Sequence, residues 1–165
     1  MGNRLIFCLF FCLTLSCDNQ SEVFIADAVF VDSMNKQIGR VEIIEQGRGS
    51  NFRIELSSLN HGYYAMHIHE KGVCEPPNFT TSGNHHGLRS DGTFAGDFKP
   101  INIKKEVNRY TNKIKDFNKI IFLPDIFLNP SSESSIMDED GSSIIVHANM
   151  HGGARIACAV IKIRN

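Results

Sequence analysis

The chain has 165 residues, which suits one domain long enough to bury a core of its own. Its 17 lysines and arginines nearly balance 18 aspartates and glutamates, so no overall field draws it to nucleic acid, and we expect no nucleic-acid partner. Five of the seven histidines fall within residues 61–86 and the other two lie near the C-terminus, and this clustering requires an explanation.

The N-terminus has the pattern of an export signal. Arg4 gives a positive start, an apolar run of eleven residues begins at Leu5, and Cys17 is followed by polar residues. The run is too short to span a bilayer alone. We predict a signal peptide of the lipoprotein type over residues 1–16, with Cys17 lipidated and residues 17–21 as a tether. The protein would then be a periplasmic or cell-envelope lipoprotein; an ordinary secretory signal or a buried core helix is the alternative.

Export changes the meaning of the cysteines. Cys8 and Cys12 would leave with the signal and Cys17 would carry lipid, so Cys74 and Cys158 remain as a pair in an oxidising compartment. We predict one disulfide between them. It would close a loop of about 84 residues and stabilise the fold by about 4 to 5 kcal/mol on a chain-entropy basis. Two buried free thiols are the alternative.

Short strands alternate with turn residues after the tether. The segment NFRIELSS alternates apolar and polar residues, which is the period of a strand with one buried face. The expected strands, in chain order, span residues 22–31, 39–46, 51–58, 63–69, 119–124, 143–147 and 155–163. Residues 102–117 read as a further strand followed by a solvated loop, and no long amphipathic helix stands out. The pattern predicts one all-β domain over residues 22–165, a sandwich or flattened barrel.

The histidines predict a metal centre. Alternate residues of a strand share a face, so His67 and His69 can present two imidazoles to one ion. Such a pair is weak evidence alone, because two histidines on a strand are often only solvated. His85 and His86 in a glycine-flanked loop, and His147 at the end of an apolar strand, strengthen it. Imidazole suits copper, zinc, iron and nickel, and an all-nitrogen site with an open position suits copper redox chemistry.

Five segments in chain order resemble the copper/zinc superoxide dismutases, particularly their secreted bacterial members. They are HIHEKGVCEP, GNHHG, AGD, SIIVH and GGARIACAVI, and the resemblance covers about residues 22 to 165. The closing block is the most specific, because the family pairs an arginine, here Arg155, with a cysteine, here Cys158, whose disulfide reaches Cys74. The resemblance implies an eight-stranded Greek-key β-barrel, an immunoglobulin-like sandwich, with one intrachain disulfide.

The resemblance also implies a copper-dependent oxidoreductase that converts superoxide to dioxygen and hydrogen peroxide. The copper ligands that it implies are His67, His69, His85 and His147. His86 is the alternative to His85, since adjacent residues cannot easily face the same ion. Arg155 would hold the superoxide anion beside copper through its planar cationic fork.

The zinc site departs from the family pattern. The segment FAGD keeps Gly96 and Asp97 but has Phe94 where the family has a histidine, and a phenyl ring cannot bind a metal. His85, His86 and Asp97 remain, one fewer than the four ligands of a closed structural site. We therefore expect no complete zinc site, with His86 and Asp97 as residual zinc ligands or as outer groups. In the outer role, Asp97 would accept a hydrogen bond that orients His85.

A second departure is the stretch HANMHGGAR, which replaces a longer charged loop of the family. Its shortness predicts a more exposed copper, and both losses together resemble the copper-only branch of the family. We expect His61 to be solvated. His151 is either exposed or a substitute ligand.

Other functions remain open at this level. A protein that stores or delivers copper without turnover would use the same four histidines, and a metal-free relative that binds a partner is a third interpretation. Arg155 favours the enzyme, because storage needs no anion-holding cation, although a surface salt bridge is its simpler role. A loop cap is the simpler role of Asp97. A homodimer is an alternative to a monomeric state.

Overall fold

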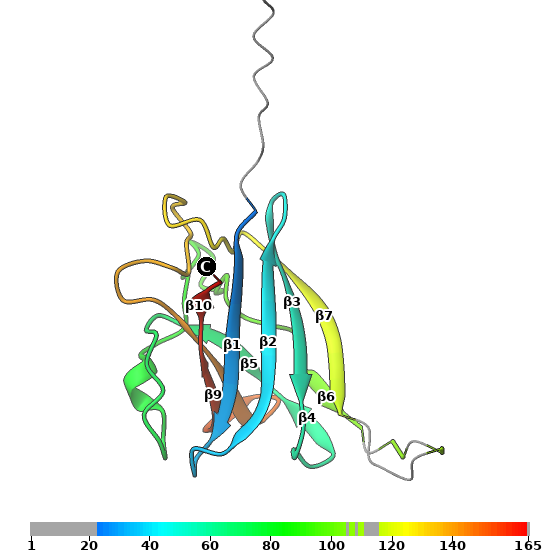
Figure 1. The fold of residues 1–165 in the computed structure, drawn as a ribbon. Coiled ribbons are helices and arrows are strands. Elements are labelled where there is room, and N and C mark those ends of the chain that lie inside the picture. The colour runs from blue at the N-terminus through cyan, green and yellow to red at the C-terminus, as the bar shows by residue number, and fades with distance from the viewer. Residues whose placement is uncertain (1–22, 105, 108, 111–115, 165) are drawn as a thin grey trace, which may run out of the picture.

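Antiparallel strands make almost all the regular structure of the computed structural model (Figure 1). The structure describes residues 23–104, 106–107, 109–110 and 116–164. The predicted signal peptide, Cys17 and the tether lie outside the described residues, so they stay predictions. Among the described residues the only helix is a 3-10 turn, η1 (Thr80–Ser82), and none is long and apolar enough to cross a bilayer.

The strands form two sheets. The larger sheet contains β1 (Ile25–Asp32), β2 (Gln37–Glu45), β3 (Gly49–Leu56), β5 (Met66–His69), β7 (Phe117–Pro124), β8 (Ser143–Asn149), β9 (Gly152–Val160) and β10 (Lys162–Ile163). The smaller contains β4 (Gly62–Tyr64) and β6 (Ile101–Ile103). The larger sheet has the order β5-β8-β9-β1-β2-β3-β7, with β10 beside β1. Strands distant in sequence, such as β5 and β8, are thus neighbours, as in a Greek key.

The predicted all-β class is confirmed, and the larger sheet curls as the expected barrel requires (Figure 1). Two of the eight predicted strands are each divided, so the described residues contain ten strands. The first division falls at Ala65, whose N–H donates to Asn149 O and whose carbonyl accepts from His147 N. The second falls at Ile161, whose N–H donates to Ser142 O. At the first point the pairing changes from β6 to β8, and at the second the pairing with β8 ends while that with β1 continues.

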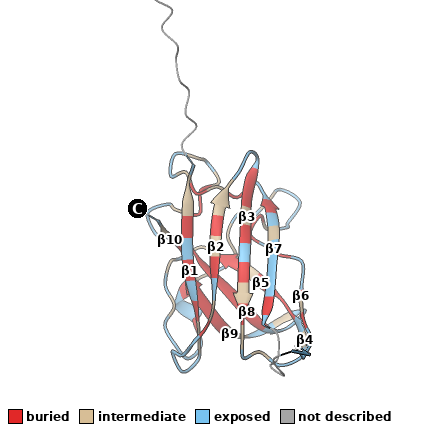
Figure 2. Cartoon of the chain, turned by 45° about the vertical axis from the view of Figure 1, so that its right-hand side comes forward, coloured by how far each residue is buried: buried red, intermediate tan, exposed pale blue. Residues whose placement is uncertain are grey.

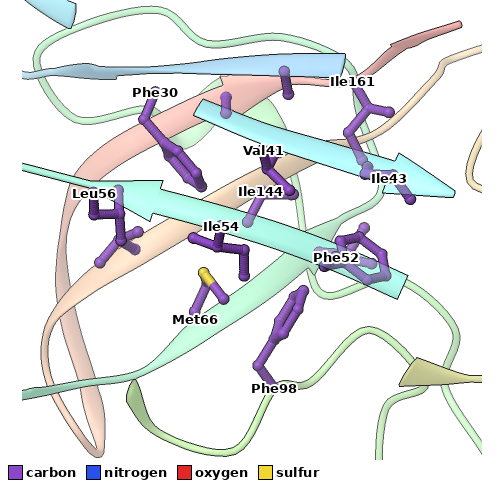
Figure 3. Close-up of a cluster of buried hydrophobic side chains, with 14 of the residues drawn as sticks. Phe30, Val41, Ile43, Phe52, Ile54, Leu56, Met66, Phe98, Ile144 and Ile161 are labelled. Carbon is purple, nitrogen blue, oxygen red and sulfur yellow. The ribbon is translucent and has the colours of Figure 1, made fainter. Parts of the chain in front are cut away.

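The core lies inside the curled sheet. Along β3, Phe52, Ile54 and Leu56 are buried while Arg53 is exposed, as the alternating sequence predicts (Figure 2). Figure 3 shows these side chains meeting apolar residues of β1, β2, β5 and β8, and Phe98 packs edge-on against Phe52 with ring centroids 5.1 Å apart. Each fully buried side chain of this size stabilises the fold by about 1.5–3 kcal/mol, so the core supports the site from within.

The predicted disulfide between Cys74 and Cys158 is present, with Cα atoms 5.7 Å apart. It joins the loop after β5 to β9 across 84 positions of sequence. Phe79, in the same loop, is fully buried against Cys158 and Ile145. The loop is therefore attached to the outer face of the β8–β9 pair by a covalent bond and by apolar packing.

Candidate metal centre

Four histidines from three segments converge on one side of the sheet. His67 and His69 belong to β5, His147 belongs to the neighbouring β8, and His85 lies in the loop after η1. Ile68, between the first two, is fully buried in the core, so both flanking imidazoles point to the opposite face. One ring nitrogen from each of the four histidines lies within 4.8 Å of the others.

Backbone pairing brings the loop that contains His85 to β5. His69 and His85 form an antiparallel bridge, and so do His67 and Asp97. The amide of Ile68 donates to Gly96 O, and its carbonyl accepts from the His86 amide. The segment therefore continues the sheet beyond β5, and this directs the side chain of His85 into the cluster.

Hydrogen bonds determine which nitrogen of three rings carries the proton. The Nδ1 atoms of His69 and His147 lie 3.0 Å from the carbonyl oxygens of Gly83 and Gly153, and His85 Nδ1 lies 2.9 Å from Asp97 Oδ1. Carbonyl and carboxylate oxygens only accept, so each Nδ1 donates, and in the neutral form of each ring Nε2 keeps its lone pair. These three Nε2 atoms are available to a metal.

The remaining lone pairs are buried without partners. His67 Nδ1, His69 Nε2 and His147 Nε2 have no hydrogen-bond partner within the protein. Burial lowers the pKa of His67 to about 4 and that of His69 to about 3, and it also lowers the pKa of His147. The rings are therefore neutral at neutral pH. Buried unpaired polar atoms are costly, and an ion bound by all of them removes that cost, so this all-imidazole set fits copper.

Arg155 lies beside the cluster, paired with His147 across β8 and β9. Its Nη1 donates to Phe79 O at 2.7 Å and to Ser82 Oγ at 2.9 Å, and its Nη2 donates to Gly83 O at 2.8 Å. No carboxylate of the described residues forms an ion pair with it. The guanidinium is half-buried, and this burial lowers the pKa of Arg155. A fixed positive charge therefore stands next to the four imidazoles.

The residues predicted for zinc separate into two groups. Asp97 joins the cluster through its direct hydrogen bond to His85, and the Phe94 ring lies beside the same imidazole, with centroids 5.0 Å apart. His86 is not brought in. Burial lowers the pKa of His86, against the opposing effect of the Asp138 and Glu70 charges, and His86 is not a member of the four-histidine cluster.

Other histidines also lie apart from the cluster. His61 and His151 are exposed and lie outside the cluster. This agrees with the expected solvation of His61 and with the exposed alternative for His151. Sequence reasoning missed the carbonyl oxygens of Gly83 and Gly153, which orient two of the rings. Every residue has a backbone carbonyl, so the sequence does not show which carbonyl accepts a hydrogen bond. Only the presence of glycine at these two positions could have drawn attention to them.

Comparisons with known proteins agree with this geometry. The family model described as copper/zinc superoxide dismutase matches residues 37–161. A Cu-Zn superoxide dismutase of Caulobacter vibrioides is 34% identical over 155 residues, covering 83% of this chain and 85% of the relative. A Cu-Zn superoxide dismutase of Aquifex aeolicus is 28% identical over 153 residues, covering 82% of this chain and 86% of the relative.

Solved structures are also similar. The crystal structure of a superoxide dismutase-like protein from Bacillus subtilis is 28% identical with a TM-score of 0.68, covering 81% of this chain and 95% of the other. The structure of a Cu/Zn superoxide dismutase from Brucella abortus has a TM-score of 0.58 at 21% identity, covering 84% of this chain and 99% of the other. This likeness supports the fold alone.

Proposed function

Because this chain belongs to the copper/zinc superoxide dismutase family, we propose that it disproportionates superoxide to dioxygen and hydrogen peroxide. Copper, when bound, supplies the one-electron oxidation and the one-electron reduction that the two half-reactions need. The observation that carries the proposal is the convergence of four imidazole nitrogens. Three of these nitrogens are buried and have no hydrogen-bond partner within the protein.

The proposed ligands are His67 through Nδ1 and the other three histidines, His69, His85 and His147, through Nε2. His67 differs because its own Nδ1 is the buried atom without a hydrogen bond. The Nδ1–H bonds of the other three rings hold the ring planes and direct each Nε2 toward the cluster. The protein thereby keeps four imidazole donors oriented toward one point.

Arg155 is proposed to bind the superoxide anion. Its guanidinium is held by carbonyl and hydroxyl oxygens, which leave its positive charge unneutralised. A fixed cation in a partly buried position attracts a small anion and orients it. A protein that only stores copper has no use for this arrangement, so the storage interpretation is less well supported.

We propose that a complete zinc site is absent and that activity does not depend on zinc. Asp97 accepts directly from His85 Nδ1, which is the nitrogen that a bridging zinc would need. Phe94 occupies the position of a zinc ligand of the family and packs on His85. His86 lies outside the four-histidine cluster.

Asp97 takes over the task of orienting His85. Asp97→Asn keeps an acceptor but removes the charge, and we expect copper affinity to fall by about tenfold. Unchanged copper affinity and unchanged activity in this variant would refute the orienting role.

The test of the proposed function is to measure metal content and dismutation together. The chain without its predicted signal peptide is loaded with copper alone, or with copper and zinc, and superoxide decay is followed by stopped flow. We expect rapid decay with copper alone and no gain from zinc. Tight copper binding without turnover would overturn the proposal in favour of a copper-handling protein.

We further propose that the protein acts outside the cytoplasm, attached to a membrane by lipid on Cys17. The disulfide supports an oxidising compartment, where such bonds persist. Labelling with a radioactive fatty acid should mark the wild-type chain and not Cys17→Ser. Equal labelling of both chains, or of neither, would contradict the anchor.

A further inference from the structure

The peptide group between Gly83 and Asn84 connects a carboxylate to the candidate metal centre. We propose that Glu70 is a positioning residue that acts through this peptide group on His69 and Arg155. The inference rests on the proposed function, in which His69 binds copper and Arg155 holds the anion. Its own evidence is a chain of hydrogen bonds that exists without metal.

The two ends of the peptide group have opposite partners. On one side, the Asn84 N–H donates to Glu70 Oε1 at 2.9 Å, and the Asn84 side-chain amide donates to the same oxygen at 3.5 Å. On the other side, Gly83 O accepts from His69 Nδ1 at 3.0 Å and from Arg155 Nη2 at 2.8 Å. One planar group thus joins an acidic side chain to the imidazole and the guanidinium.

These contacts reinforce one another. A negative charge at the N–H and a positive charge at the C=O polarise the amide in the same direction, and each hydrogen bond in such a chain strengthens its neighbours by about 10–30%. Gly83 O thereby becomes a stronger acceptor for the proton on His69 Nδ1. A stronger acceptor there makes Nε2 a better metal donor, and it fixes both the ring and the guanidinium.

Gly83 allows Glu70 to reach this position. Its φ of +75° lies in the region that favours glycine. A Cβ at this residue would lie 2.5 Å from Glu70 Oε1 and 2.8 Å from its Cγ, so any other residue would displace the carboxylate. Glycine here therefore provides both the backbone conformation and the space that the glutamate occupies.

The loop does not depend on the glutamate side chain alone for its pairing with β5. The amide of Glu70 donates to Asn84 O at 3.0 Å, and that of Lys71 donates to Ser82 O at 3.1 Å. The disulfide also holds the loop. Removing the charge of Glu70 should therefore leave the loop in place and change mainly the polarisation of the peptide group.

The test compares Glu70→Gln, Glu70→Ala and the control Glu75→Gln. Glutamine keeps an oxygen acceptor and loses the charge, alanine loses both, and Glu75 is an exposed carboxylate of the same loop. In the metal-free protein, NMR follows the His69 Nδ1 proton. We expect its exchange with water to quicken by about threefold in Glu70→Gln and by about tenfold in Glu70→Ala, and to stay unchanged in the control.

The copper-loaded forms provide a second readout. We expect copper affinity to fall in the same order, by about threefold in Glu70→Gln and about tenfold in Glu70→Ala. An unchanged His69 proton in both Glu70 variants would overturn the inference, even with dismutation intact. A changed proton in a protein that binds copper but does not turn over superoxide would support the inference while refuting the proposed function.

Discussion

The two sides of His85 differ in how many donors they offer to a metal. On the side of Nε2, three further imidazoles converge, and their lone pairs are buried without partners. On the side of Nδ1, a carboxylate of Asp97 is already hydrogen-bonded and a Phe94 ring packs against the imidazole. The same ring thus lies between the proposed copper ligand set, which is the complete side, and the proposed remnant of a zinc site, which is the incomplete side.

Under the proposed assignment, this difference explains how a copper site can persist beside an incomplete zinc site. A bridging imidazole that loses one metal must still be oriented, because a free ring would not direct its second nitrogen. The hydrogen bond from Nδ1 to a carboxylate provides this orientation at 2.9 Å. In the proposed site, His85 therefore stays oriented toward the other three histidines without zinc.

The largest expected effect comes from removing a donor on the complete side. His147→Ala should reduce dismutation and copper affinity by more than about 100-fold, because a direct ligand contributes more than the outer groups whose loss costs 10–100-fold. Copper titration and stopped-flow decay measure it. His151→Ala, in the exposed turn nearby, is the control and should behave as wild type. Equal losses in both variants would contradict the ligand assignment.

The next effect concerns the anion rather than the metal. Arg155→Gln removes the positive charge, and kcat/KM should fall by at least about tenfold, with a weaker dependence on ionic strength. Copper affinity should change far less, because Arg155 is not a donor. Measuring decay rates over a series of salt concentrations tests this. If the salt dependence survives in the variant, another group provides the attraction.

The incomplete side can be tested by adding a donor. Phe94→His places an imidazole beside His85 and Asp97 and should raise zinc affinity by about tenfold, still short of the four ligands of a closed site. Calorimetric zinc titration of the copper-loaded protein measures it, with Phe94→Leu as control. If wild type already binds zinc as tightly as the variant does, the proposed absence of the site is wrong.

The last prediction concerns the pH dependence of stability in the metal-free protein, and it leaves activity aside. Burial lowers the folded-state pKa of His67 to about 4 and of His69 to about 3, below the ordinary value of 6.5. Between these values the unfolded chain binds more protons, so stability should fall as pH drops from 6.5 toward 4. Urea unfolding at several pH values measures this. His67→Gln should flatten the slope, and an unchanged slope would show that this ring does not contribute.

Much of the complete side follows from local sequence. The period of a strand places His67 and His69 on one face, and the buried Ile68 between them agrees with that reading. The count of cysteines that the predicted signal would leave identifies Cys74 and Cys158, and the structure joins them. The alternation in β3 likewise locates its buried face.

The local sequence did not determine whether His85 or His86 joins the other three histidines. Both are imidazoles in one glycine-flanked loop, and only the bridge from His69 to His85 directs one of them toward the other histidines. The role of Glu70 was equally hidden, since it depends on a peptide group 14 residues away in the chain.

The physical reason is the range of the interactions involved. Side-chain direction within a strand repeats every two residues, so the sequence by itself determined which residues of β5 share the face of the candidate metal centre and which residues enter the core. Side-chain direction in a loop depends on hydrogen bonds to distant backbone groups. Only the tertiary structure therefore decided the candidate fourth ligand, the carbonyl oxygens that orient the rings, and the contact of Asp97 with His85.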